Sequence, residues 1–305
     1  WMTISTLVKS GEKQEKVFRR ISDLCIHYQN RMPVTLPPIV SGEVDKFRDV
    51  PNHDTYADTI HSILEKLKPG HVEKVVLSRS HHVKIDQNFS SVSAMQVLRN
   101  AYPNCMSFFY SFPNQGIFFG STPERLIKLN DDYFETEALA GTIARGKNME
   151  EDRLLSETLL ESHKEREEHR YVLEQLQRKL SGLCNDLESS EIPQIFKLKN
   201  VQHLKTPIYG SLNSKMHILE LVNRIHPTPA VAGTPTVDAI SIIEELETHD
   251  RGWYSGPIGW SDIDGNGEFY VGLRSALVSA NEAHVFAGGG IVSESIAQRE
   301  WEETE

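Results

Sequence analysis

The stretches GEFYVGLRSALVSA (residues 267–280) and AHVFAGGGIV (residues 283–292) decide the fold class of this chain. Both are rich in β-branched and aromatic residues, which is typical of strands. A third strand-like stretch, GPIGWSDI (residues 256–263), comes shortly before them. Strands that follow one another in blocks, without strict alternation with helices, favour an α+β protein with a largely antiparallel sheet.

The remaining chain shows the same blocks. Strands are predicted at residues 73–85, 105–112, 116–120, 124–129, 133–140 and 195–212. Helices are predicted at residues 11–29, 54–69, 90–103, 214–227, 236–247 and 295–305, with one or two long helices within 148–183. The helix over 54–69 is predicted to begin at an Asp cap and to end at Pro-Gly. The loop-like stretch 31–53 is interpreted as a linker between elements, without a firm domain boundary.

Composition excludes several classes of protein. The 305 residues carry a formal charge of −11, which argues against a nucleic-acid partner or an anionic membrane surface. No apolar run is long enough for a membrane span, and the first residues lack the pattern of a signal peptide. Cys25, Cys105 and Cys184 are few, odd in number and far apart. They favour a reducing cytoplasm over a disulfide framework.

Two acidic clusters, KEREEH (residues 164–169) and EWEETE (residues 300–305), each place glutamates three residues apart and therefore on one helix face. Such clusters are usually solvated helix faces. Trp301 within the second cluster favours another interpretation, in which the two clusters hold a hard cation such as Mg²⁺. Spacing alone leaves both interpretations open.

Lys74 and Glu124 are candidates for acid–base chemistry. Lys74 lies in the strand-like stretch EKVVLSR, where a lysine is usually an edge or solvent-facing residue. If it were desolvated instead, its amine could serve as a general base, because burial lowers the pKa of a lysine in general. Glu124 follows the sequence GSTP and would be an exposed strand-end residue or, against apolar walls, a proton donor with a raised pKa.

Arg274 is the one charge in the stretch FYVGLRSALV, and a mid-strand arginine among apolar residues needs an anionic partner. That partner is either a protein carboxylate or an anionic ligand. The run AGGGIV (residues 287–292) offers backbone N–H groups to a carboxylate, or forms a tight turn.

Other metal motifs fail on inspection. His163 and His169 do not form HExxH, and soft ligands are otherwise scarce, which argues against zinc. The stretch DIDGNGE (residues 262–268) begins like a calcium loop, but Leu273 stands where the bidentate glutamate should be. A hairpin turn is expected there.

Taken together, the motifs resemble those of the chorismate-utilising enzymes. The matching stretches, in family order over most of residues 72–305, are EKVVLSR, FGSTPERLI, ETEALAGTIARG, KEREEHRYV, HPTPAVAGTP, RGWYSGPIGW, GEFYVGLRSALV and AGGGIVSESIAQREWEET. The resemblance implies large, mostly antiparallel sheets flanked by helices, as in anthranilate synthase component I, with the site in a cleft between them. It implies a single chorismate-binding catalytic domain over residues 1–305 that lacks part of the N-terminal region of the family fold.

The resemblance also implies roles for particular residues. Mg²⁺ would bind the ring carboxylate of chorismate and be held by Glu168 and Glu300, with Glu303 and Glu165 close by. Lys74 would take a proton from the water that attacks C2, and Glu124 would protonate the departing C4 hydroxyl. The enolpyruvyl carboxylate would be received by Tyr254, Arg274 and the glycines 288–290, which include Gly289 and Gly290. The family positions at the ring and its carboxylate match Gly141, Thr142 and His226.

Two positions point to one branch of the family. Ammonia-using relatives carry Gln where this chain has Lys74, and aminodeoxychorismate synthases tend to carry Lys where it has Ala140. The implied activity is that of an isochorismate synthase, an isomerase most like the menaquinone-specific type, without an amidotransferase subunit. The alternatives are a siderophore-pathway isochorismate synthase, a salicylate synthase that goes on to eliminate pyruvate, and, with less support, an ammonia-using anthranilate or aminodeoxychorismate synthase subunit.

Overall fold

The computed structural model describes residues 9–29, 47–85, 89–112 and 116–304. The chain divides into two compact units, residues 1–39 and 40–305, which are considered separately. The first unit contains α1 (Gln14–Gln29), close to the helix predicted over 11–29. Every candidate site residue lies in the second unit. The expectation of one catalytic domain over residues 1–305 stays a prediction.

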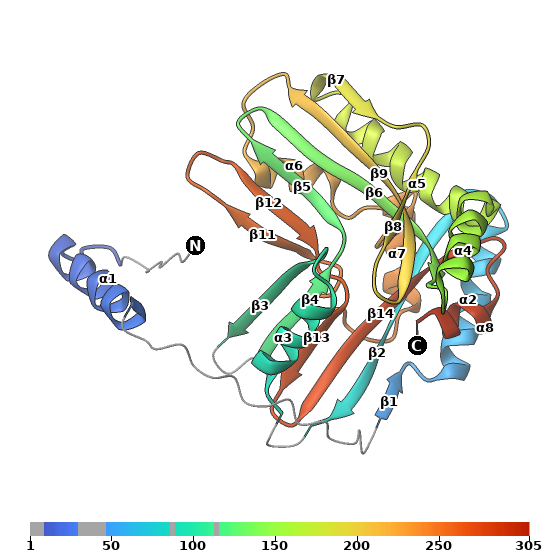
Figure 1. Cartoon of the computed structure of the whole chain (residues 1–305), viewed down its shortest axis with the longest axis horizontal. Coiled ribbons are helices and arrows are strands. Elements are labelled where there is room, and N and C mark those ends of the chain that lie inside the picture. The colour runs from blue at the N-terminus through green and yellow to red at the C-terminus, as the bar shows by residue number, and fades with distance from the viewer. Residues whose placement is uncertain (1–8, 30–46, 86–88, 113–115, 305) are drawn as a thin grey trace. The chain divides into compact units, whose positions relative to one another are not determined.

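Two seven-stranded sheets form the frame of the second unit (Figure 1). The first sheet has the order β1 (Phe47–Val50), β2 (Lys74–Lys84), β14 (Glu282–Val292), β13 (Ser275–Ser279), β4 (Gly116–Thr122), β3 (Met106–Phe112), and β10 (Gly233–Thr234) also pairs with β2. The second has the order β11 (Pro257–Ser261), β12 (Gly267–Val271), β5 (Arg125–Asn130), β6 (Tyr133–Ala144), β9 (Val201–Leu212), β7 (Cys184–Ser189), and β8 (Gln194–Lys197) pairs with β9. Every pairing between described strands is antiparallel, which confirms the predicted α+β class.

Helices pack on the sheets and bury their apolar faces there (Figure 1). Those of the second unit are α2 (His53–Leu67), α3 (Ser91–Ala101), α4 (Met149–Glu161), α5 (His163–Leu180), α6 (Ile218–Ile225), α7 (Thr236–Leu246) and α8 (Ala297–Glu303). One hydrophobic core joins α5 and α6 to the second sheet, and another joins α2, α7 and α8 to β2 and β14 of the first. No helix among the described residues has the length and apolarity that a membrane crossing requires.

Several local features differ from the sequence-based expectations. The cap of α2 is Asn52, whose side chain accepts a hydrogen bond from the Thr55 N–H, so the expected Asp cap is wrong. The short strands β1, β7 and β10 were not predicted, and β7 (CNDLES) is too polar to be recognised without its partner β9. The stretch 262–268 does form the expected hairpin turn, between β11 and β12.

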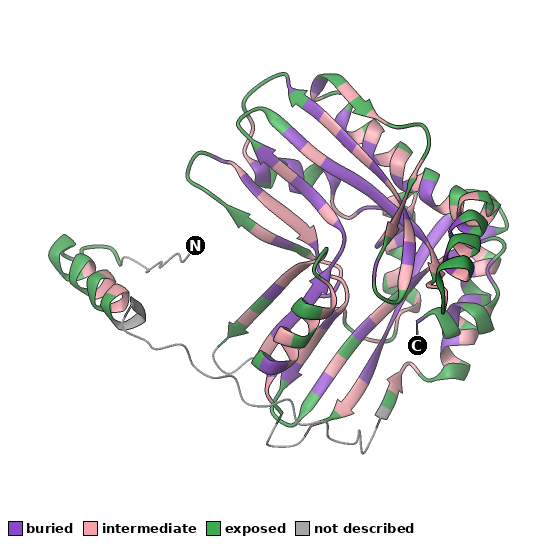
Figure 2. Cartoon of the chain, viewed as in Figure 1, coloured by how far each residue is buried: buried purple, intermediate pink, exposed green. Residues whose placement is uncertain are grey.

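Two of the connections between the sheets lie side by side. One crossing joins β4 to β5 and contains Glu124, and the other joins β12 to β13 and contains Arg274. Backbone hydrogen bonds link them, because Ser121 N–H donates to Arg274 O (3.2 Å) and Val271 N–H donates to Glu124 O (3.0 Å). In the burial map of Figure 2, β4, which flanks the first crossing, is mostly buried, whereas β12, which flanks the second, is mainly intermediate. The fold therefore places two of the candidate residues at the junction of the sheets.

Candidate active site

Lys74 is an interior residue of its sheet. It begins β2, opposite Thr234 of β10 and Val292 of β14, and its solvent exposure is 0%. Its Nζ donates a hydrogen bond to Oε1 of Glu168 on α5, at 2.7 Å. The usual expectation for a strand lysine, an edge or solvent-facing position, is therefore wrong here. The sheet holds a buried amine beside one carboxylate.

Gly290 makes room for this lysine. A Cβ at position 290 would lie 2.6 Å from both Glu168 Oε1 and Lys74 Cε, closer than real Cβ contacts come. Any side chain here would have to displace the Lys74–Glu168 pair. The glycine is therefore required by the pair that it faces.

Glu124 is buried at the crossing from β4 to β5. Its Oε1 accepts a long hydrogen bond of 3.5 Å from the Thr228 hydroxyl. Burial, followed by the negative charge of Glu137, raises the pKa of Glu124 to about 8, while Lys74 and Thr228 oppose the shift. The raised pKa that was predicted for a carboxyl against apolar walls is confirmed. At neutral pH this side chain carries a proton that it can donate.

Four glutamates from α5 and α8 lie close enough to influence one another electrostatically. Glu165 accepts a hydrogen bond from the Thr142 N–H at 2.7 Å, and burial, with Glu168 next in importance, raises its pKa. Glu300 is almost fully buried, and its Oε2 has no hydrogen-bond partner among the described residues. The acidic clusters, 132 residues apart between Glu168 and Glu300, thus meet in space.

Glu303 keeps an exposed surface, yet its carboxylate is affected by the cluster. Partial burial, then the charges of Glu168 and Glu300, raise its pKa to about 8, and contact with solvent weakens such repulsion. Lys164 lies within the cluster and donates to Glu300 Oε1 at 3.1 Å. Burial alone would lower the pKa of Lys164, but Glu300 and Glu165 raise it overall.

The carboxylates of the predicted metal ligands Glu168, Glu300 and Glu303 are not yet as close together as the ligands of one bound ion would be. Their carboxylate oxygens do not all lie within 4.8 Å of one another in the described part of the chain. Lys74 binds Glu168, and Lys164 binds Glu300, so ammonium groups offset two of the negative charges.

Arg274 lies in the break between β12 and β13, so its predicted mid-strand position is wrong. Its backbone φ of 49° belongs to the left-handed region, which few arginines adopt. No carboxylate among the described residues pairs with its guanidinium, and Nη2 donates instead to Nε2 of His203 at 2.7 Å. Of the two partners that the sequence left open, the described residues supply no carboxylate, and the guanidinium stays available to an anionic ligand.

His203 is the residue that sequence reasoning missed. It lies on β9, where its Nδ1 contacts the Thr142 hydroxyl at 3.1 Å and the Gly141 carbonyl oxygen at 3.3 Å. Burial, then the adjacent Arg274, lowers its pKa to about 4, so its ring is neutral at pH 7. A single histidine in an alternating strand carries no signal of this kind, because only the register of β6 with β9 brings it to the site.

Gly141 and Thr142 form a bulge in β6. The register with β9 shifts between Ala140 and Thr142, and Gly141 has a φ of 77°. A Cβ on Gly141 would lie 3.0 Å from the Glu165 carbonyl oxygen. The bulge turns the Thr142 N–H toward Glu165 and its hydroxyl toward His203.

The glycines 288–290 are part of β14, so the alternative of a tight turn is wrong. They pair with Ser78, Leu77 and Val76 of β2 along one edge. Among the described residues, β13 pairs with β14 only over Glu282–Val285, so the other edge beside the glycines has no strand partner. Backbone N–H groups on that edge are available to a ligand.

Tyr254 lies beside these glycines, and a Cβ on Gly288 would come within 2.8 Å of its hydroxyl oxygen. Its ring stacks on Phe286, with 5.3 Å between centroids, and burial raises the pKa of the phenol. Gly289 is looser, because a Cβ there would lie 3.6 Å from Glu300 Oε2. The glycine run thus joins Tyr254 to the carboxylate cluster.

His226 caps the C-terminal end of α6, and burial lowers its pKa to about 4. Its Nδ1 is buried without a hydrogen-bond partner among the described residues. The structure gives it no hydrogen bond to another candidate residue, although Thr228, two residues later, contacts Glu124. Its assignment to the substrate ring stays a prediction.

Comparison with known proteins gives this arrangement a family. Residues 1–305 match the family described as "Chorismate binding enzyme". The chain is 33% identical over 312 residues to the isochorismate synthase MenF of Bacillus subtilis, covering 100% of this chain and 64% of that protein. It is 38% identical over 245 residues to the salicylate biosynthesis isochorismate synthase of Pseudomonas aeruginosa, covering 80% of this chain and 51% of that protein.

A solved structure shares the fold. The menaquinone-specific isochorismate synthase MenF of Escherichia coli superposes with a TM-score of 0.85 at 30% identity, covering 94% of this chain and 66% of that one. The chain thus spans about half to two thirds of the length of these relatives. A match along all 305 residues nevertheless decides the family: this chain belongs to the chorismate binding enzymes.

Proposed function

We propose that this chain converts chorismate to isochorismate. The observation that carries the proposal is the combination of a buried lysine amine with a separate, buried and protonated carboxyl. The charge of Lys74 affects the pKa of Glu124, yet Lys74 lies on β2 and Glu124 lies in the connection between β4 and β5. A base and an acid on different elements of the fold suit a reaction in which one hydroxyl enters while another leaves.

In the proposed reaction, Lys74 acts after losing one proton. It takes a proton from water as the water oxygen bonds to C2 of chorismate. The ring double bonds shift, the C4–O bond breaks, and Glu124 gives its proton to the departing hydroxyl, which leaves as water. Lys74 ends protonated and Glu124 ionised, and proton exchange with solvent restores both. General base and general acid catalysis each contribute about 10²–10⁴-fold.

The carboxylate cluster suits a hard cation. Glu300 Oε2 is a buried oxygen without a partner among the described residues, and oxygen ligands are those that Mg²⁺ prefers. We assign Glu168 and Glu300 to Mg²⁺, with Glu303 and Glu165 beside them. The cation would offset the charge of the substrate ring carboxylate within an acidic protein.

We assign anion recognition to the part of the site formed by Arg274 and the open edge of β14. Arg274 has no protein carboxylate among the described residues, and the open edge of β14 offers backbone N–H groups. We assign Arg274, Tyr254, Gly289 and Gly290 to the enolpyruvyl carboxylate. Gly141, Thr142 and His226 are assigned to the ring and its carboxylate.

The pathway is proposed from the relatives. Two of the proteins compared are named MenF, which supports menaquinone biosynthesis, and a cytoplasmic enzyme fits the three free cysteines. Salicylate formation is kept as a second outcome to be measured, because chorismate chemistry of that kind would begin with the same base and acid.

A chromatographic product assay tests the proposal. Chorismate is incubated with the protein in ammonium-free buffer, with Mg²⁺ or with EDTA. We expect isochorismate only with Mg²⁺ and no pyruvate. Pyruvate with salicylate would identify a salicylate synthase instead. An aminated product that forms only after ammonium is added would identify an ammonia-using synthase. No conversion under any of these conditions would contradict the proposal.

The metal assignment has its own variant. Glu168→Ala should raise the Mg²⁺ concentration needed for half-maximal rate by about 10-fold or more. The control is Glu174→Ala on the same helix, where the carboxylate is half exposed and pairs with Arg170. An unchanged Mg²⁺ dependence in Glu168→Ala would remove this residue from the site.

A further inference from the structure

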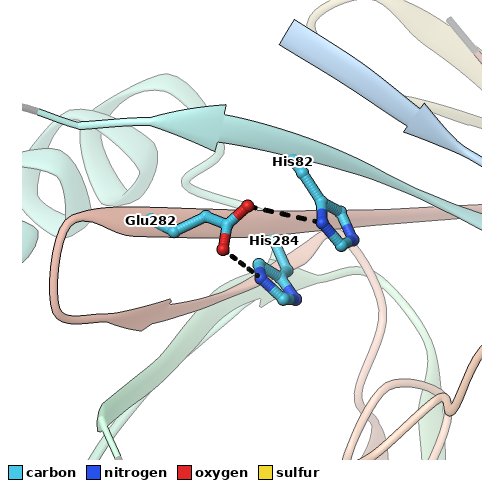
Figure 3. Close-up of side chains that lie close together, drawn as sticks. All are labelled: His82, Glu282 and His284. Atoms are coloured by element: carbon cyan, nitrogen blue, oxygen red, sulfur yellow. Dashed lines mark ion pairs between the residues drawn. The ribbon is translucent and has the colours of Figure 1, made fainter. Parts of the chain in front are cut away.

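A second group of potential metal ligands lies far along the same strands from Lys74. Three side chains from β2 and β14 make it up, namely His82, Glu282 and His284 (Figure 3). One ligand atom from each lies within 4.8 Å of the other two, and no other group of this kind occurs among the described residues. His82 and His284 are direct cross-strand neighbours, and Glu282 is two residues before His284, so all three project from one face.

The distances within this group fit a metal ion. Glu282 reaches His82 Nδ1 with Oε1 at 3.4 Å and His284 Nε2 with Oε2 at 3.3 Å. For a tetrahedral ion with bonds of about 2.0–2.1 Å, two ligand atoms lie about 3.3–3.4 Å apart. The carboxylate is thus already spaced from each imidazole as two ligands of one ion would be.

The hydrogen bonds of His82 also suit metal binding. Arg48 donates to His82 Nδ1 at 3.0 Å, so that nitrogen carries a lone pair, and Nε2–H is left to donate to the Ser80 hydroxyl at 3.0 Å. An imidazole that is held through its other nitrogen is the usual form of a histidine metal ligand.

Two contacts must change when an ion enters. The imidazoles of His82 and His284 stack at 3.9 Å with 15° between planes, and they must open so that both lone pairs meet at one point. Arg48 must withdraw from His82 Nδ1. Both changes are available, because Arg48 is exposed and the His284 and Glu282 side chains keep 34% and 50% of their surface in solvent.

We propose that His82, Glu282 and His284 form a binding site for a divalent transition-metal ion of the zinc class. Two imidazoles and one carboxylate leave a coordination position for water or an external ligand. Eight residues along β2 separate His82 from Lys74, roughly 26 Å at the rise of an extended strand. The site is therefore independent of the proposed Mg²⁺ ligands. The proposal runs against the expectation from sequence, which argued against zinc because no HExxH motif is present and soft ligands are scarce.

The experiment is a titration of the metal-stripped full chain with Zn²⁺, followed by calorimetry, with Co²⁺ as a spectroscopic probe. We expect one zinc site that survives Glu300→Gln and is lost, by about 100-fold or more in affinity, in His82→Ala and in His284→Ala. Ser80→Ala should weaken binding by about 10-fold, since the ring of His82 loses its support. Circular dichroism confirms that each variant is folded.

Two further variants make the test specific. Arg48→Ala should tighten zinc binding, because it removes a competing donor and a positive charge from His82. His61→Ala, at an exposed histidine on α2, should leave binding unchanged. Equal zinc affinity in the wild type, His82→Ala and His284→Ala would overturn the proposal, as would the absence of cobalt absorption bands typical of nitrogen ligation.

Discussion

The two ends of the ladder between β2 and β14 carry ionisable side chains on the same face, and they differ in burial. At one end, Lys74 is fully buried against Glu168, and Gly290 leaves it room. At the other end, His82 and His284 face a half-exposed glutamate. The backbone pairing is continuous between them, so the pairing itself does not determine the chemistry.

What differs is the covering layer. Helix α5 brings Glu168 over the Lys74 end, and α8 adds Glu300, so charges there are held with little water. Around His82, the neighbouring side chains of Arg48 and Glu282 are themselves exposed, so solvent and ions can reach the group. One ladder therefore carries a buried lysine–glutamate pair where α5 and α8 lie over it, and a partly exposed imidazole–carboxylate group at its other end.

The strongest test removes the lysine at the covered end. Lys74→Ala should lower the rate of isochorismate formation by about 10⁴-fold, the upper end for a general base, because Glu168 also loses its hydrogen bond. Lys84→Ala is the matched control, an exposed lysine at the far end of the same strand. Turnover numbers for both variants are compared with the wild type. Near wild-type turnover in Lys74→Ala would refute its role.

Glu124→Gln should lower the rate by about 10³-fold, since the amide keeps the shape of the side chain but has no acidic proton to donate. In the wild type, the rate should fall as the pH rises through about 8, where Glu124 ionises. A rate profile from pH 6 to pH 10 measures this decline. If Glu124→Gln turned over normally, another group would have to be the acid.

Glu124 and Glu282 should change the free energy of unfolding in opposite directions as the pH rises. The pKa of Glu124 is raised from 4.5 to about 8 by folding, so its stabilisation is full below pH 4.5 and is lost as the pH rises toward 8. Glu124→Gln should therefore increase the free energy of unfolding at pH 7 by about 1–3 kcal/mol. Glu282 has a lowered pKa, and its contribution is instead lost in acid. Urea unfolding at pH 5 and pH 7 measures the change due to Glu124, and unfolding below pH 4.5 measures the change due to Glu282.

A smaller effect is expected from filling the space at Gly290. Gly290→Ala should reduce turnover by about 100-fold, because the new methyl group displaces Lys74 or Glu168 by about 1 Å. Gly182→Ala serves as the control, since a Cβ there meets nothing within 4 Å. Steady-state kinetics with saturating chorismate would measure both. Equal rates would mean that the pair tolerates displacement.

The smallest effect concerns the open end. Without added metal, His82→Ala should change the free energy of unfolding by less than about 1 kcal/mol, because the contact that it removes involves a half-exposed glutamate. Urea unfolding in the presence of EDTA gives the value. A loss of several kcal/mol would show that the imidazole stack has a structural role that the comparison overlooks.

Some of this architecture could be predicted from the sequence. The strand blocks near the C-terminus predict antiparallel sheets, and the position of Glu124 after GSTP is compatible with a buried acid. Lys74 was the harder case, because its immediate neighbours in the strand describe an ordinary edge lysine equally well. Its burial depends on β10, β14 and α5, which are all distant in sequence.

Other features had no local signal. His203 reaches Arg274 and Thr142 only through the bulged register of β6 and β9. His82 and His284 meet because two strands pair in one register out of many. The glycine run also depends on its position in the fold. It lies in a strand, where Gly288 leaves space for Tyr254 and Gly290 leaves space for Lys74.

The paired crossings between the sheets have a mechanical consequence. Glu124 and Arg274 sit on neighbouring connections that hydrogen-bond to each other through Ser121 and Val271. If one sheet rotated against the other, the axis of rotation would pass close to these connections. In such a rotation Glu124 and Arg274 would move least and the outer strands most, so the distance between these two residues would change little.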